Sequence, residues 1–154
     1  MKTQLLLVLA FAFTLVFTSC KKDDDTVEPT ITAPSMSFTF NGTAKTVEST
    51  KIAAASGTQG GTTFVSITGT MGADTLIIAC PLATGSYPVT FLSGNTLVAY
   101  STTADDYIAL EGTVVLTSIA DKKLTGTFTA SSPSGGLFPE FTITSGKFSN
   151  VTYL

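Results

Sequence analysis

Apolar and polar residues alternate with a period of two along most of this chain, a pattern typical of β-strands that bury one face. Residues 36–40 show it, and Asn41-Gly42 follows them with the residue pair that a type I′ hairpin turn favours. Thr43–Val47 is the predicted return strand. No window beyond residue 35 carries a sustained apolar period of 3.6 residues. The pattern therefore predicts an all-β domain.

The same alternation returns at intervals of roughly ten residues, separated by turn signals. Thr62–Met71 puts Val65 and Ile67 on one face. Residues 75–80 are apolar on both faces, which predicts a central strand, and Pro81 is expected to end it or to lie at an edge because it has no N–H. The other predicted strands are residues 52–56, 87–92, 96–101, 107–110, 113–119, 124–130, 141–148 and 151–154, with turns or loops at 57–61, 72–74, 93–95, 120–123 and 131–140.

These elements predict one domain, residues 36–154, built as an antiparallel β-sandwich of about ten short strands in mostly sequential hairpins. A closed β-barrel is the alternative, because strands and turns recur at the same spacing in both architectures. A domain of this length is able to bury a sizeable core without disulfides or metals.

Residues 1–25 are organised differently. Lys2 precedes an apolar run at residues 5–17, and Ser19-Cys20 follows the run. The run is shorter than the about 20 residues that span a bilayer, and it fits the core of a secretory signal. An ordinary signal peptide and a buried helix are the alternatives. The order of charge, apolar run and cysteine resembles a bacterial lipoprotein signal, although Phe17 stands where such signals typically have Leu.

The lipoprotein resemblance implies that residues 1–19 are a cleaved signal peptide and that Cys20 carries acyl chains such as palmitate. Two or three chains anchor a protein durably, since one chain alone binds a membrane only marginally. Residues 20–35 would then be a flexible acidic tether, because they contain Pro29, Pro34 and few apolar side chains.

The leader is similar to those of Bacteroidetes lipoproteins, in which acidic residues after the lipidated cysteine look like a surface-export signal. This resemblance implies an outer-membrane protein that faces the cell exterior; the periplasmic face, with a merely solvated charge run, is the alternative. The residues of the expected export signal are Lys21, Lys22, Asp23, Asp24 and Asp25.

Two short motifs resemble the Asp-Ser/Thr-apolar sequon of Bacteroidetes O-glycosylation. They are Asp25-Thr26-Val27 and Asp74-Thr75-Leu76, so Thr26 and Thr75 are the expected acceptors. Chance occurrence is the alternative for motifs this short.

A further resemblance extends over residues 36–154. Four stretches, in this order behind the leader, look like the spaced blocks of a family of uncharacterised Bacteroidetes lipoproteins. The family implies a β-domain on a tether and brings no catalytic residues. The stretches are Thr84-Gly85-Ser86-Tyr87, residues 111–117, Leu124-Thr125-Gly126-Thr127-Phe128 and residues 143–148.

Composition removes whole classes of function. The chain has no His, no Trp and no Arg, and its formal net charge is −3. An acidic chain without arginine argues against a nucleic-acid partner, since phosphate contacts rely on Lys and Arg. Ser and Thr make up 40 of the 129 residues from Thr26 onward, so the solvent-facing strand positions must carry mainly hydroxyls.

The absence of His also bears on catalysis and on metals. It removes the usual Ser–His and Cys–His arrangements, and it leaves only Cys80 and carboxylates for zinc. We therefore expect no enzymatic activity, no metal and no cofactor. Cys80 lies in an apolar strand and is expected to be a small buried side chain. Asp105-Asp106 is the best local carboxylate cluster, interpreted as a polar connector or, alternatively, as a loop that faces a ligand or a calcium ion.

Two functional hypotheses follow. One is a surface-displayed binding or adhesion module for a glycan, a peptide or a partner of the envelope. The other is a structural accessory lipoprotein of an envelope complex without a ligand site of its own. A pocket with convergent polar groups would favour a ligand site. A packed interior with a broad apolar outer patch would favour a protein partner.

The leader generates one test. Cys20→Ser should block lipidation and release the protein from membranes, because the acyl chains have no other attachment point in the predicted signal. Labelled palmitate should enter the parent protein and not the variant. Equal label in both would contradict the lipoprotein interpretation.

Overall fold

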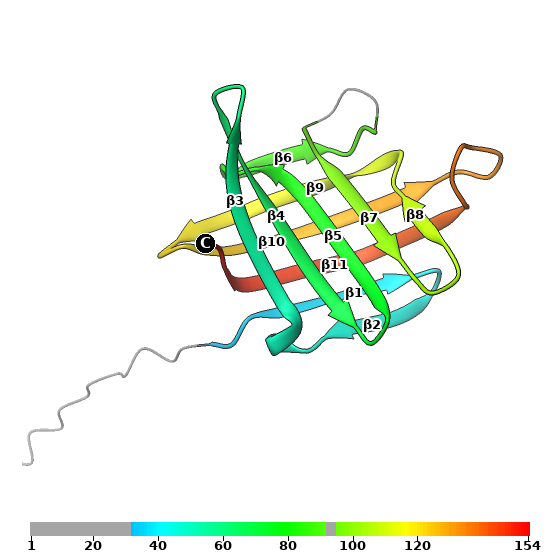
Figure 1. Cartoon of the computed structure of the whole chain (residues 1–154), viewed down its shortest axis with the longest axis horizontal. Coiled ribbons are helices and arrows are strands. Elements are labelled where there is room, and N and C mark those ends of the chain that lie inside the picture. The colour runs from blue at the N-terminus through cyan, green and yellow to red at the C-terminus, as the bar shows by residue number, and fades with distance from the viewer. Residues whose placement is uncertain (1–31, 92–94) are drawn as a thin grey trace, which may run out of the picture. The chain divides into compact units, whose positions relative to one another are not determined.

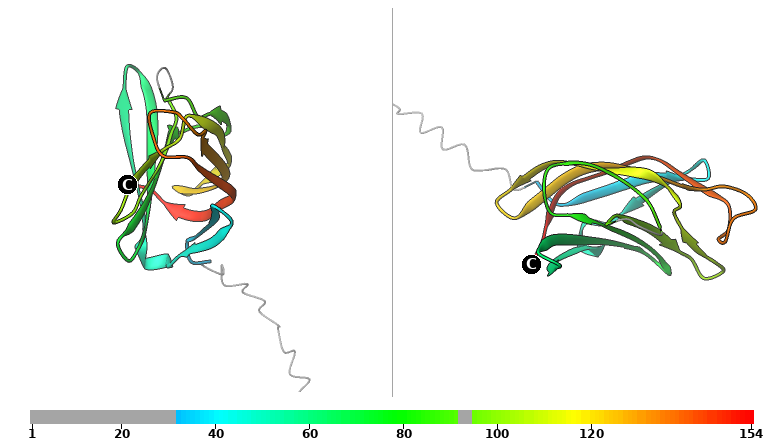
Figure 2. Two further views of the ribbon diagram at one scale, coloured as in Figure 1. Left: turned by 90° about the vertical axis from the view of Figure 1, so that its right-hand side faces the viewer. Right: turned by 90° about the horizontal axis from the view of Figure 1, so that it is seen from above.

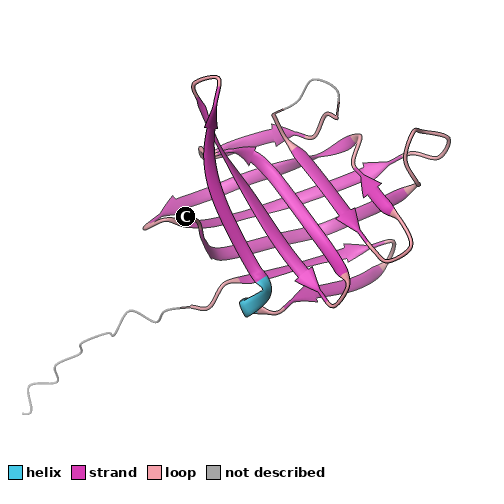
Figure 3. Cartoon of the chain, in the orientation of Figure 1, coloured by secondary structure: helices cyan, strands magenta, loops and turns pink. Residues whose placement is uncertain are grey.

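The described residues form two antiparallel β-sheets packed face to face. The computed structural model describes residues 32–91 and 95–154. Within them lie eleven strands and one short 3-10 helix, η1 (Ser49–Lys51), and no α-helix. The predicted all-β class is confirmed (Figure 3). The predicted signal peptide and most of the predicted tether lie outside the described residues.

The first sheet has six strands in the order β2-β1-β11-β10-β9-β6. The first strand of the domain therefore pairs with the last one, so the sheet assembles from both ends of the domain. Its strands are β1 (Ser35–Phe40), β2 (Thr43–Val47), β6 (Gly85–Pro88), β9 (Glu111–Ala120), β10 (Lys123–Ser132) and β11 (Phe141–Thr152).

The second sheet has five strands in the order β3-β4-β5-β7-β8, with β5 at its centre, as the sequence predicts for residues 75–80. Its strands run across those of the six-stranded sheet behind it (Figure 1). The two layers are seen from the side in Figure 2. Its strands are β3 (Ile52–Gln59), β4 (Thr62–Met71), β5 (Asp74–Pro81), β7 (Leu97–Ser101) and β8 (Asp106–Ile108).

The two sheets remain separate, so the closed barrel is wrong and the sandwich is confirmed. One isolated parallel bridge, between Ala54 of β3 and Tyr153, links them at a corner. There the Ser56 N–H donates to the Leu154 carbonyl at 3.0 Å, and the Leu154 N–H donates to the Ala54 carbonyl at 3.3 Å. The Tyr153 N–H still donates to the Lys122 carbonyl of the β9–β10 turn at 3.0 Å, so the end of the chain bridges the two sheets and Leu154 extends the edge of the five-stranded one.

Two hairpin turns contain non-glycine residues with positive φ, and one of them is the turn that the sequence predicts at Asn41-Gly42. Asn41 and Gly42 have φ values of 45° and 81°, the positive pair that a type I′ turn requires between β1 and β2. Asp121 and Lys122 also have positive φ and connect β9 to β10. The chain is joined mostly by sequential hairpins, as predicted.

One predicted hairpin is wrong. Residues 87–92 and 96–101 were expected to pair around residues 93–95. Instead β6 pairs with β9 in the six-stranded sheet, and β7 pairs with β5 in the other, so this connection crosses between the sheets. β6 ends at Pro88, which has no N–H for a further ladder bond.

Two boundaries also differ from the prediction. β3 continues to Gln59, and only Gly60 and Gly61 form the turn, because uncharged residues with small side chains extend as readily as they loop. Residues 141–148 and 151–154 were predicted as two strands, but β11 runs unbroken to Thr152. The register between β10 and β11 shifts at two places, and these shifts accommodate residues with positive φ such as Ser145 and Asn150. The pairing of the two strands continues beyond them.

Aromatic side chains fill the space between the sheets at one end. Tyr100 of β7 is fully buried, and its ring centroid lies 4.5 Å from that of Phe40 and 5.7 Å from that of Phe38, both on β1. Tyr107 and Phe141 extend the cluster, each in an edge-on contact with a neighbouring ring. These offset and edge-on geometries add to the free energy of burial.

A polar contact inside the sandwich accompanies this aromatic cluster. The Tyr100 hydroxyl donates to Asp74 Oδ2 at 2.6 Å, and Lys45 Nζ lies 3.4 Å from the same oxygen. Asp74 is on the five-stranded sheet and Lys45 on the six-stranded sheet. The hydrogen bond from Tyr100, and secondly Lys45, lower the pKa of Asp74 against the opposing effect of burial. Asp74, which the sequence places in the 72–74 turn, instead opens β5 and is only partly exposed.

This contact predicts a pH-dependent stability. Tyr100→Phe should lower the free energy of unfolding by about 1–3 kcal/mol at pH 7, because Asp74 loses its closest donor. A carboxyl whose pKa is lowered by folding stabilises the fold above its ordinary pKa of 3.8, and that contribution disappears as the pH falls through the folded-state pKa. The cost of the variant should therefore shrink at pH 3.

Urea unfolding at both pH values measures the effect. Tyr87→Phe is the matched control, because the Tyr87 hydroxyl donates to the Ala83 carbonyl at 2.8 Å in an exposed setting. That variant should change stability little and equally at both pH values. An equal cost of Tyr100→Phe at pH 7 and pH 3 would contradict the role assigned to Asp74.

The predicted burial of Cys80 is confirmed, and it generates a second test. Its side chain faces the interior with no exposed area, and burial raises the pKa of its thiol to about 11. A thiol reagent should label native protein slowly and denatured protein quickly. Cys80→Ala should fold at a cost of about 1–2 kcal/mol and should abolish the label that appears on denaturation. Fast labelling of the native parent that disappears in Cys80→Ala would contradict the buried position.

Candidate functional site

The outer face of the five-stranded sheet is almost uncharged, and apolar side chains on β5, β7 and β8 form a continuous strip across it. Hydroxyl side chains, among them Ser66, Thr68 and Thr75, occupy other positions of the same face. Its positions alternate with the buried ones along each strand. Asp106, at the corner formed by β8, is the only charged side chain that strand alternation and register place on this face among the described residues. The apolar and glycine positions are Ala53, Ala55, Gly57, Phe64, Ile77, Ala79, Leu97, Ala99 and Ile108.

The outer face of the six-stranded sheet has the opposite character. Lys147 lies on it, and most of its other positions carry hydroxyls, as the composition predicts for a solvated strand face. The two outer faces therefore differ in degree: the five-stranded sheet carries a continuous apolar strip, and the six-stranded sheet is covered mainly by hydroxyls. The hydroxyl positions are Ser37, Thr39, Thr113, Thr117, Thr125, Thr127, Thr129, Ser131, Thr142 and Thr144.

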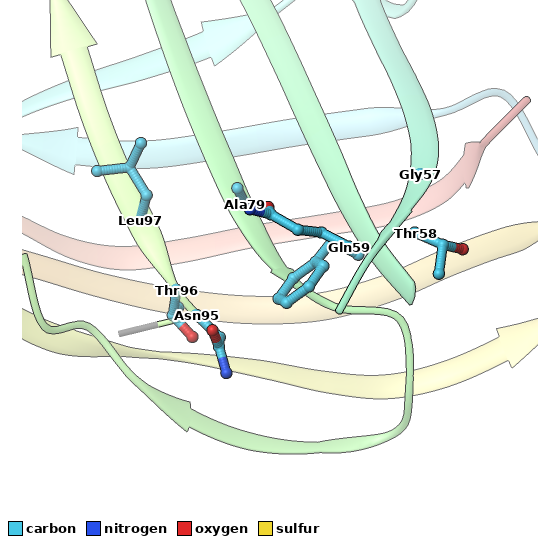
Figure 4. A pocket seen from close by; sticks show the side chains of 8 residues that line it. Gly57, Thr58, Gln59, Ala79, Asn95, Thr96 and Leu97 are labelled. Carbon is cyan, nitrogen blue, oxygen red and sulfur yellow. The ribbon is translucent and has the colours of Figure 1, made fainter. Parts of the chain in front are cut away.

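A hollow of about 460 Å³ opens on this uncharged face, where β3 and β4 meet the start of β7. Phe64, Ala79 and Leu97 supply its apolar lining. Ala79 lies between Leu97 on one side and Gln59 on the other (Figure 4). Each comes from a different strand, and cross-strand pairing of Ala79 with Leu97 fixes their spacing.

Neutral polar side chains form the rest of the hollow. Thr58 and Gln59 lie on the β3 side, and Asn95 and Thr96 lie on the β7 side (Figure 4). Thr96 is only 5% exposed, and its hydroxyl has no hydrogen-bond partner within residues 32–91 and 95–154. The carboxamides of Gln59 and Asn95 likewise make no hydrogen bond there. Among the described residues, no hydrogen bond competes with a ligand for these groups.

Gly57 keeps the hollow open on the β3 side. A Cβ built at Gly57 would meet no atom within 4 Å. Its neighbour across the ladder is Phe64, so no β3 side chain covers that position of the face. A side chain at position 57 would therefore project into open space on this face.

The hollow carries no group for acid–base or nucleophilic chemistry, since none of its lining side chains titrates. In the part of the chain that the structure describes, no three His, Cys, Asp or Glu side chains come together to hold a metal ion. The lining therefore offers apolar surface and neutral hydrogen-bonding groups.

The predicted Asp105-Asp106 cluster lies away from this hollow. Both residues are exposed. The Asp105 carbonyl accepts the Thr102 N–H at 2.9 Å, so the loop is closed by its own backbone. The Tyr107 hydroxyl lies 3.4 Å from Asp105 Oδ2 and makes the one side-chain hydrogen bond found for this carboxylate pair among the described residues.

The other predicted sites are scattered. Thr75 lies on the uncharged face at the start of β5 and is half-buried. Cys20, Thr26 and the acidic residues behind Cys20 lie outside the described residues. The tyrosines pack as the sequence suggests: Tyr100 is in the core, and the other three lie partly buried against it.

Sequence reasoning missed the hollow. The signal was present, because residues 75–80 are apolar on both faces and Leu97 and Ala99 continue that pattern in β7. It was interpreted only as a central strand. The sequence alone does not show whether another layer covers this outer face. Among the described residues, no other layer does.

No family model, no curated protein and no solved structure matches this chain. Across the residues that the structure describes, no helix has the length and apolar character needed to cross a membrane.

Proposed function

We propose that this protein is a non-enzymatic binding module that engages its partner through the outer face of the five-stranded sheet. The observation that carries the proposal is the uncharged strip of apolar side chains on β5, β7 and β8, beside a hydroxyl-covered opposite face. Contiguous apolar patches on soluble proteins mark interaction sites, because exposing them to water costs free energy that a partner recovers.

The position of the patch on a sheet supports a defined binding surface. Ile77, Ala99 and Ile108 lie side by side on three neighbouring strands, so hydrogen bonds fix their spacing. Rigid strands place side chains more accurately than loops do, and a preorganised surface loses little entropy on binding.

The leader supplies the proposed setting. Lipidation at Cys20 would hold the domain at the outer membrane on its tether, facing the exterior if residues 21–25 act as an export signal. Anchoring raises the effective concentration of a weak binding site at the surface, because many copies engage a large partner together. A shallow, uncharged face is suited to such multivalent adhesion.

A pair of lysine substitutions tests the face. Ala99→Lys places a charge at its centre, between Ile77 and Ile108, and should abolish capture of envelope material by the full-length lipoprotein, because burying an unpaired charge is unfavourable. Thr129→Lys, on the outer face of the six-stranded sheet, is the matched control and should leave capture unchanged. Far-UV circular dichroism should show both variants folded.

Capture is measured by pull-down from outer-membrane fractions. If Ala99→Lys retains the same material as the parent, the face is not the binding surface, and the protein is better described as a structural accessory lipoprotein.

A further inference from the structure

We infer that the hollow on the five-stranded sheet binds one neutral sugar unit of a carbohydrate chain. The inference rests on the proposed function, since it names the ligand class for the same face. It depends on three features of the hollow: its apolar lining, its polar side chains and the absence of charged residues from the lining.

The lining suits the apolar side of a sugar ring. Phe64, Ala79 and Leu97 offer carbon surface from three strands. A sugar ring presents C–H groups on its faces, and these pack on aliphatic side chains and on the negative face of an aromatic ring. Such packing removes apolar area of both partners from water.

The polar side chains suit the hydroxyls at the edge of the ring. Gln59 and Asn95 each carry a carbonyl acceptor and an amide donor, and Thr58 and Thr96 each carry a hydroxyl that is able to do both. A sugar hydroxyl is likewise donor and acceptor at once. Thr96 is the least exposed of these four residues, and its hydroxyl has no hydrogen-bond partner within the described residues, so a sugar hydroxyl would supply one.

The absence of charge sets the ligand class. None of the lining residues is acidic or basic, so a uronic acid, a phosphate or an amine would lose hydration without gaining a counter-charge. A neutral ligand carries no such cost. The volume of about 460 Å³ falls within the range of small-molecule sites, and the open mouth leaves room for a chain to continue along the face.

Gly57 offers a variant that blocks the site without disturbing the fold. Because a Cβ at this position meets nothing within 4 Å, Gly57→Val should be accommodated and should favour the strand. Its side chain would project beside Phe64, into the space that the ligand needs.

The test uses the full-length protein and a panel of neutral gluco-, manno- and galacto-oligosaccharides, with an oligouronate as the charged comparison, by isothermal titration calorimetry. At least one neutral sugar should bind, and the oligouronate should not. Gln59→Ala and Asn95→Ala should each weaken binding about fivefold to tenfold. Gly57→Val should abolish binding with unchanged thermal stability, and Thr129→Ala should bind like the parent.

Three outcomes overturn the inference: no neutral sugar binds, the oligouronate binds best, or Gly57→Val binds like the parent. These failures are distinguishable from failure of the proposed function. If no oligosaccharide of the panel binds while Ala99→Lys still abolishes envelope capture, the face binds a protein and the binding-module proposal stands. If both tests are negative, neither holds.

Discussion

The buried Tyr100 holds the two sheets together. Its ring packs on Phe38 and Phe40 across the sandwich, and its hydroxyl donates to Asp74, which also lies near Lys45 of the opposite sheet. Burial first, and Asp74 second, raise the pKa of Tyr100, so the hydroxyl remains a donor at alkaline pH. Cys80, the one cysteine among the described residues, is free, so the relative position of the two sheets there depends on such non-covalent contacts.

Sheet edges in this protein are protected in different ways. β2 directs the charged Lys45 inward, β6 is short and ends in Pro88, and β8 has only three residues, all of which discourage pairing with another chain. β3 has no charge and no irregularity, and Tyr153 and Leu154 cover part of its edge instead. Edge protection therefore leaves the apolar outer face as the surface open to a partner.

The sequence predicts the local elements well and their long-range arrangement poorly. Asn41-Gly42 tolerates the positive φ of a hairpin turn, and residues 75–80 are apolar on both faces. The turn and the central strand were therefore predictable from local sequence. The connection between β6 and β7 was not, because turn residues do not reveal which sheet each flanking strand joins. The hollow depends on Gly57, Ala79 and Leu97 meeting across separate strands, and register of this kind is set by the whole sheet.

The last bridge of the chain has a practical consequence for handling the protein. Leu154 hydrogen-bonds to Ala54 and Ser56 of β3, and Ser56 directly precedes Gly57, so any peptide fused after Leu154 would be directed along that same strand edge. A purification tag placed there would compete with a ligand for the hollow or lengthen the sheet artificially. Reporter groups for binding studies are better attached at the exposed turn formed by Asp121 and Lys122, on the connection between β9 and β10.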